Sequence, residues 1–131
     1  MKIAIATDDG RTLSRHFGRA VYYAVLTVED GSVVAHEMRR KFSPHGSGIE
    51  AHEEREAGPH REGPASYSRH DQMAAAIADC SAVICGGMGQ GAYDRMTANG
   101  IRPIVTDLQD VDEAAIECAA GRIVDHPERL H

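Results

Sequence analysis

The hydrophobic pattern of the first part of the chain predicts β-structure. Residues 2–7 form a continuous apolar run rich in Ile and Ala, which is typical of a strand buried on both faces. Residues 20–28 and 33–38 are rich in β-branched and aromatic side chains, which favours two further strands. Between them, residues 29–32 contain an Asp-Gly pair, a favoured centre for a tight hairpin turn. The chain is therefore expected to open with a strand, a polar loop and a β-hairpin.

After residue 68, apolar runs alternate with helical spacing. Met73, Ile77 and Cys80, with interleaved alanines, give one apolar helix face. Ser68, three residues before Asp71, resembles a capping box that starts this helix. The elements predicted beyond it are a strand at 82–85, a helix at 92–99 capped by a left-handed Gly100, a strand at 101–106 whose Pro103 suggests a sheet edge, and a helix from Asp110 to Gly121 with Cys118 on its inner face.

The order of these elements predicts an α/β fold in which helices cover a mixed five-stranded sheet. With 131 residues, the chain is expected to form one domain with a sizeable core. Residues 43–68 contain three prolines and no sustained period, so they are expected to form a flexible loop. Residues from about 122 onward are expected to form a short C-terminal tail.

Composition and charge narrow the class of protein. A net charge of -6 argues against binding to nucleic acid or to an anionic membrane surface, because both require basic surface. No apolar run approaches the length of a membrane span. The apolar run near the N-terminus is too short for a signal peptide, and acidic residues follow it at once. Three cysteines, an odd number without CxxC spacing, do not predict a disulfide framework. A cytoplasmic location is therefore expected.

A glycine-rich loop follows the strand predicted at residues 82–85. Residues 86–91 contain four glycines and lead into a predicted helix, and such strand-to-helix loops often hold ligands in α/β proteins. No Lys-Ser/Thr pair follows, so this is not a Walker A loop, and the dinucleotide fingerprint is also poorly matched. Because two glycines suffice for a turn, a ligand-facing loop is favoured over a tight turn that only packs the helix close to the strand.

His16 and Cys85 are candidate ligands beside this loop. His16, in the sequence His-Phe-Gly-Arg, follows the first strand and lies at the same sheet edge as the glycine loop if both strands run parallel. A neutral imidazole binds iron, zinc or copper readily, although an exposed loop histidine is also consistent with simple solvation. Cys85 is either a thiolate ligand, with its pKa lowered by the helix N-terminus, or a small buried residue.

Two further groups of residues have alternative interpretations. Half of the histidines lie in or beside the irregular segment, without the spacing of a structural zinc site: His45, His52, His60 and His70. They are either solvated, or one of them, His45 or His70, reaches a bound metal species. Asp8 and Asp9 after the first strand, with Asp107 after the last, are either residues that end strands or carboxylates that hold Mg²⁺ for phosphoryl transfer or hydrolysis.

Three segments together carry a family resemblance. Residues 13–20, 83–92 and 100–105 are similar to the dinitrogenase iron–molybdenum cofactor biosynthesis family, and the similarity extends from Met1 to about Gly121. The resemblance implies a three-layer α/β/α fold of ribonuclease H-like topology. It also implies a non-catalytic carrier that binds an iron–sulfur or iron–molybdenum cofactor, or its precursor. Partners would be the metallocluster itself and cofactor-assembly or acceptor proteins.

The resemblance also suggests roles for individual residues. His16 is the expected metal ligand, with Cys85 or a histidine of the irregular segment as a second ligand. The glycine loop would place backbone N–H groups against an anionic cluster, and Arg15 and Arg19 would balance its charge. The full set of expected cofactor-binding residues is His16, Phe17, Gly18, Arg19, Cys85, Gly86, Gly87, Gly89 and Gly91. The alternatives are a Mg²⁺-dependent enzyme that uses Asp8 and Asp9, or a regulatory domain whose glycine loop only shapes a partner-binding surface.

Overall fold

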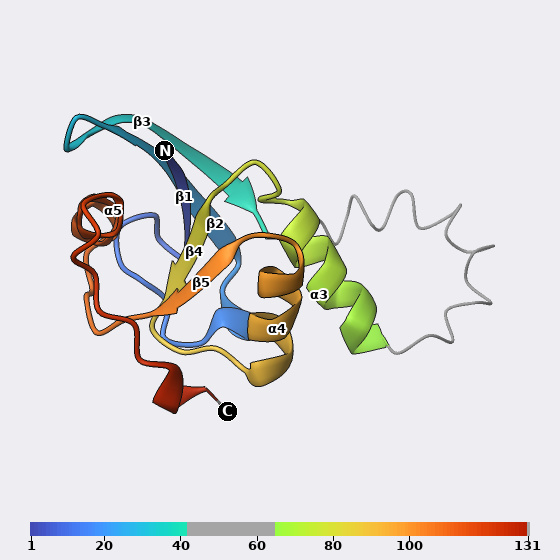
Figure 1. Cartoon of the computed structure of the whole chain (residues 1–131). Coiled ribbons are helices and arrows are strands. Elements are labelled where there is room, and N and C mark those ends of the chain that lie inside the picture. Colours follow the sequence, from blue (N-terminus) through green and yellow to red (C-terminus); the bar gives the residue numbers. More distant parts are fainter. Residues whose placement is uncertain (42–64, 131) are drawn as a thin grey trace.

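A computed structural model describes residues 1–41 and 65–130 of the chain (Figure 1). The predicted loop at 43–68 falls mostly outside these residues, as do His45, His52 and His60. The elements in chain order are β1 (Lys2–Thr7), the 3-10 helix η1 (Phe17–Arg19), β2 (Tyr22–Glu29), β3 (Ser32–Arg40), α3 (Ala65–Ala75), β4 (Ala82–Cys85), α4 (Gln90–Ala98), β5 (Arg102–Val105), α5 (Val111–Ala119) and the 3-10 helix η3 (Pro127–Arg129).

The five strands form one mixed sheet in the order β3-β2-β1-β4-β5. β1 pairs antiparallel with β2, and β2 with β3, whereas β1, β4 and β5 run parallel. This confirms the predicted mixed five-stranded sheet, and β5 lies at an edge as Pro103 suggested. The parallel arrangement of β1 and β4 brings the carboxyl ends of both strands to the same edge of the sheet. The ribonuclease H-like label stays a prediction.

Helices cover both faces of the sheet, as Figure 1 shows with α3 and α4 on one side and α5 on the other. The residues of β4 alternate between two cores: Val83 and Cys85 face α3 and α4, whereas Ala82 and Ile84 face α5. This period of two explains why the strand reads as a continuous apolar run, since both of its faces are buried. The predicted three-layer α/β/α architecture is confirmed.

The turns and helix caps that depend on neighbouring residues were predicted correctly. Asp30 and Gly31 have φ values of 51° and 77°, the positive angles that a tight hairpin turn of the Asp-Gly type requires. Gly100 has a φ of 79° after α4, as expected for a left-handed cap. The Asp110 carboxylate accepts a hydrogen bond from the Glu113 N–H at 2.8 Å and caps α5.

Two helix starts were predicted wrongly. α3 already includes residue 65, so Ser68 lies inside the helix instead of capping it. α4 begins at Gln90, two positions before the predicted start, and Gly89 is its N-cap without a side-chain hydrogen bond. A glycine has no capping side chain to mark the start of a helix, so the sequence pattern placed the boundary at the first alanine instead.

The C-terminal tail wraps around the outer edge of β5. The Val105 N–H donates to the Asp125 carboxylate at 2.9 Å, and the His126 N–H donates to the Val105 carbonyl at 2.8 Å. On either side of this contact, Ile123 packs against the core below α5 and Leu130 packs against the core below α3 and α4. None of the helices among the described residues is long and apolar enough to cross a membrane.

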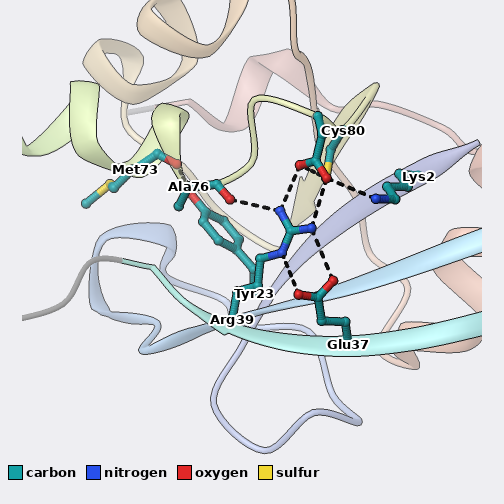
Figure 2. A network of polar contacts seen from close by, with 8 residues as sticks. Lys2, Tyr23, Glu37, Arg39, Met73, Ala76 and Cys80 are labelled. Carbon is teal, nitrogen blue, oxygen red and sulfur yellow. Dashed lines mark hydrogen bonds and ion pairs between the residues drawn. The ribbon is translucent and has the colours of Figure 1, made fainter.

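A polar network joins edge strand β3 to the connection between α3 and β4 (Figure 2). The Arg39 guanidinium donates to the Asp79 carboxylate at 2.7 and 2.9 Å, to the Glu37 carboxylate at 3.1 Å and to the Ala76 carbonyl at 3.0 Å. Lys2 of β1 adds an ion pair to Asp79 at 3.1 Å. The guanidinium hydrogen bonds hold the pKa values of the Asp79 and Glu37 carboxyls below their ordinary range.

These lowered pKa values predict a loss of stability in acid. A carboxyl whose folded pKa is below its unfolded value stabilises the fold above about pH 4, and this stabilisation is lost as the pH falls further. The urea midpoint of unfolding is therefore expected to fall steadily from about pH 5 to pH 2.5. In Asp79→Asn, which cannot titrate at this position, the fall should be shallower. Identical slopes in the two proteins would contradict the assignment.

Candidate functional site

The His16 loop, residues 13–20, leaves the carboxyl end of β1 and returns to β2. The Ser14 hydroxyl accepts a hydrogen bond from the His16 N–H and donates one to the His16 carbonyl, both at 3.1 Å. The same carbonyl also accepts from the Arg19 N–H at 2.9 Å. The backbone of His16 is thus fixed by local bonds, while its side chain belongs to an exposed residue that precedes η1.

Two backbone hydrogen bonds join the His16 loop to the glycine loop after β4. The Gly86 N–H donates to the Ser14 carbonyl at 2.7 Å, and the Phe17 N–H donates to the Gly87 carbonyl at 2.9 Å. The two motifs that the sequence placed at one sheet edge are therefore in direct contact. This juxtaposition follows from the parallel pairing of β1 and β4.

This contact requires a glycine at position 87 and leaves little room for a side chain at Gly86. A Cβ atom on Gly87 would lie 2.4 Å from the Arg15 carbonyl oxygen, and one on Gly86 would lie 3.1 Å from the Ser14 carbonyl oxygen. The group that approaches the bare glycine backbone is therefore the His16 loop of the same chain. The backbone wall for a ligand, which the sequence suggested for these glycines, stays a prediction.

The other three glycines of the predicted set differ from this pair. Gly89 precedes α4 as its N-cap, and Gly91 lies inside α4, where an added Cβ would meet the His70 ring at 3.0 Å. His70 is half-buried on α3, so Gly91 permits the close packing of α3 against α4 at this point. An added Cβ on Gly18, in η1, would meet nothing within 4 Å.

Phe17 is an anchor of the loop. Its side chain is 2% exposed and belongs to the core below α3 and α4. The ring centroid lies 6.1 Å from that of Tyr23 and 4.1 Å from the Lys41 ammonium. Nothing in the sequence pattern pointed to Lys41, because a lysine at the end of an exposed edge strand is ordinarily solvated. Burial of Phe17 leaves His16 and Arg19 as the exposed side chains of the His-Phe-Gly-Arg motif.

Cys85 is fully buried in the same core. Burial raises the pKa of its thiol to about 12, and this effect outweighs the hydrogen bond from Gly87 and the charge of Lys41, which act in the opposite direction. Of the two interpretations of Cys85, burial and the raised pKa favour the small buried residue over a thiolate whose pKa is lowered by a helix N-terminus. Cys80 and Cys118 are also buried, and desolvation raises the pKa values of their thiols. Cys80 follows α3 instead of lying on it.

An open groove of about 440 Å³ lies beside His16. It is lined by Asp8, Asp9, Thr12, Leu13, Ser14, Arg15, His16 and Arg19. Basic side chains therefore come from the His16 loop itself, and acidic side chains come from the end of β1. His16 is the only histidine among these lining residues, and none of them is a cysteine. Within residues 1–41 and 65–130, no three His, Cys, Asp or Glu side chains are arranged to hold a metal ion.

The carboxylates at this edge have structural partners. Asp8 accepts from the Val21 N–H at 3.0 Å, and Asp9 accepts from the Arg11 and Thr12 N–H groups at 2.8 Å. These backbone bonds lower the pKa of Asp9 to about 2. Asp107 forms an ion pair with Arg129 of the tail, and its carboxylate lies 3.4 Å from the His126 Nε2. These contacts favour the interpretation of all three as residues that shape strand ends over the interpretation as Mg²⁺ ligands.

The chain belongs to the dinitrogenase iron–molybdenum cofactor family, whose model matches residues 1–121. No curated protein matches the sequence at a significant level.

Several solved structures share the fold. The structure of PH0822 is 20% identical with a TM-score of 0.64, and the match covers 98% of each chain. MJ0327 from Methanocaldococcus jannaschii is 16% identical with a TM-score of 0.61, over 97% of this chain and 95% of that one. The apo form of the orange protein from Desulfovibrio gigas is 16% identical with a TM-score of 0.64, over 96% of this chain and 92% of that one.

Proposed function

We propose that the protein is a cytoplasmic carrier that binds an iron–sulfur or iron–molybdenum cluster, or its precursor, as cargo. It hands this cargo to cofactor-assembly or acceptor proteins and performs no turnover of its own. The proposal is supported by membership of a family named for the iron–molybdenum cofactor. It is also supported by the groove beside His16, which is lined by this exposed histidine and by two arginines of the same loop.

The observation that carries the proposal is the way His16 is held. Its backbone is fixed by Ser14 and by the contact with the glycine loop, whereas its side chain is exposed at the groove. A neutral imidazole is a good ligand for iron and other transition metals. Among the described residues that line the groove, His16 is the only histidine and there is no cysteine, so they supply one bond to the cluster, and few bonds suit cargo that must be released.

Charge supports the same class of cargo. Arg15 and Arg19 line the groove on either side of His16 in the sequence, and metal–sulfide clusters are commonly anionic. Guanidinium groups remain charged at every physiological pH and hydrogen-bond to anions. The groove therefore offers one imidazole and two cations to an anion, and the two carboxylates that also line it, Asp8 and Asp9, accept hydrogen bonds from backbone N–H groups.

The experiment that tests the proposal is anaerobic reconstitution with iron and sulfide. Absorption spectra and metal analysis are recorded on the wild-type chain, on His16→Ala and on His36→Ala. His36 is the matched control because it is an exposed histidine on β3, outside this groove. The wild type and His36→Ala should develop a visible chromophore with bound iron, and His16→Ala should develop none.

A chromophore that survives His16→Ala unaltered would show that His16 is not the ligand. Failure of the wild-type chain to bind iron and sulfide, or isolated iron–molybdenum cofactor, would contradict the carrier function itself. A Mg²⁺-dependent activity that is lost in Asp8→Asn and retained in His16→Ala would instead establish the enzyme alternative.

A further inference from the structure

Lys41 is a buried cation directly beneath the His16 loop. The residue follows β3 and is 1% exposed. Its ammonium donates a hydrogen bond to the Phe17 carbonyl oxygen and lies 4.1 Å from the centroid of the Phe17 ring. Its backbone N–H donates to the Val21 carbonyl at 3.0 Å, just beyond the end of the same loop. Lys41 thus contacts the loop at its centre and at its C-terminal end.

Packing alone does not account for a lysine at this position. Transfer of an ammonium group from water to a protein interior is costly, and an apolar side chain of similar length would fill the same space without that cost. A cation is matched here to two features that an apolar side chain does not use, a carbonyl oxygen and the face of an aromatic ring. Both features belong to Phe17.

Phe17 in turn helps to fix His16, in addition to the local bonds with Ser14 and Arg19. Its N–H donates to the Gly87 carbonyl, its carbonyl oxygen accepts from Lys41 and from the Ala20 N–H, the latter at 3.3 Å, and its ring lies close to both Lys41 and Tyr23. His16 is the adjacent residue, so the direction of its Cα–Cβ bond depends on the backbone position of Phe17. Loss of the bond from Lys41 would leave this carbonyl with only the longer bond from Ala20, which lies within the same loop, so the centre of the loop could move relative to the glycine loop.

We propose that Lys41 is a positioning residue that locks the backbone of Phe17 and thereby presents the His16 imidazole at the groove. Its importance for cargo rests on the proposed carrier function, but the positioning itself is a property of the free protein. The two can therefore be tested separately, the first with iron and sulfide and the second without any ligand.

The test measures amide hydrogen exchange and histidine ring resonances by NMR in the full chain. In Lys41→Met, the Phe17 amide is expected to exchange about tenfold faster, as for loss of one hydrogen bond to a charged group. The ring resonances of His16 should shift and those of His36 should not. Arg40→Met removes the neighbouring cation, which is exposed and stacks on Tyr22 at 5.6 Å, and should leave both readouts unchanged.

Two results would overturn the proposal. One is an unchanged Phe17 amide in Lys41→Met. The other is equal acceleration in Phe17 and in the central amides of β1 and β4, which would mean that Lys41 only supports global stability. If Lys41→Met does not fold, contacts between the Lys41 ε-methylene protons and the Phe17 ring in the unaltered chain decide the question, and their absence overturns the proposal.

The outcome is separable from that of the carrier function. If His16→Ala retains the chromophore while Lys41→Met loosens Phe17, the ligand assignment fails and the positioning role stands. If His16→Ala loses the chromophore and Lys41→Met alters neither Phe17 nor His16, the positioning role fails alone.

Discussion

Gly87→Ala is expected to force the His16 loop away from β4. The new Cβ would lie 2.4 Å from the Arg15 carbonyl oxygen, a backbone atom that cannot move without the loop. Relief of this overlap would break the hydrogen bonds that join the two loops, including the one between the Phe17 N–H and the Gly87 carbonyl. We expect a loss of about 2–3 kcal/mol in the free energy of unfolding, measured by urea denaturation.

Gly18→Ala is the matched control for this change. Gly18 lies in η1, on the same pair of loops, and an added Cβ there meets nothing within 4 Å. The free energy of unfolding of Gly18→Ala should differ from that of the wild type by less than about 0.5 kcal/mol. Equal effects of the two alanines would mean that the contact between the loops contributes nothing to stability. Gly87→Ala should also reduce iron uptake, because it displaces the loop that carries His16.

Phe17→Ala is expected to produce the largest loss of stability. The ring is 2% exposed, packs beside Tyr23 and contacts Lys41, so its removal leaves a cavity and an ammonium without its aromatic partner. Truncation of a buried phenylalanine costs about 3–5 kcal/mol, which is a large share of the stability of a small domain. Chemical denaturation should show a marked fall in the urea midpoint.

Phe17→Leu separates packing from loop geometry. Leucine keeps most of the buried apolar volume, so it should recover at least about half of the lost stability. A loss below about 1 kcal/mol in Phe17→Ala would contradict the burial of this ring and would reopen the possibility that Phe17 itself faces a ligand.

Local chemistry explains which parts of the fold were predictable. The apolar run at β1 and the Asp-Gly turn between β2 and β3 are decided by neighbouring residues, and both were predicted correctly. The start of α4 was not, because Gly89 caps the helix without a side-chain signal. The mixed character of the sheet was predicted from the alternation of strands and helices in the second half, which requires parallel pairing, whereas the order of its strands was not predicted.

The candidate site was harder to predict because it depends on contacts between distant segments. The predicted topology placed His16 and the glycine loop at one edge of the sheet. It did not show that Gly86 and Gly87 accommodate the His16 loop, because this contact joins residues about seventy positions apart in the sequence. Cys85 is the last residue of β4, and because both faces of this strand are buried, its side chain lies in a core and not at the sheet edge. The sequence did not predict the burial of Lys41, since only the fold brings this residue into contact with Phe17.

The tail that follows α5 has a consequence for how the sheet avoids other chains. An uncovered edge strand offers its free backbone groups as a template for association between molecules. At β5 the Asp125 carboxylate and the His126 N–H already occupy both backbone groups of Val105. A version of the protein shortened to residue 121, where the family match ends, would leave that edge open to aggregation. Residues 125 and 126 thus keep the backbone groups of Val105 from pairing with a strand of another molecule.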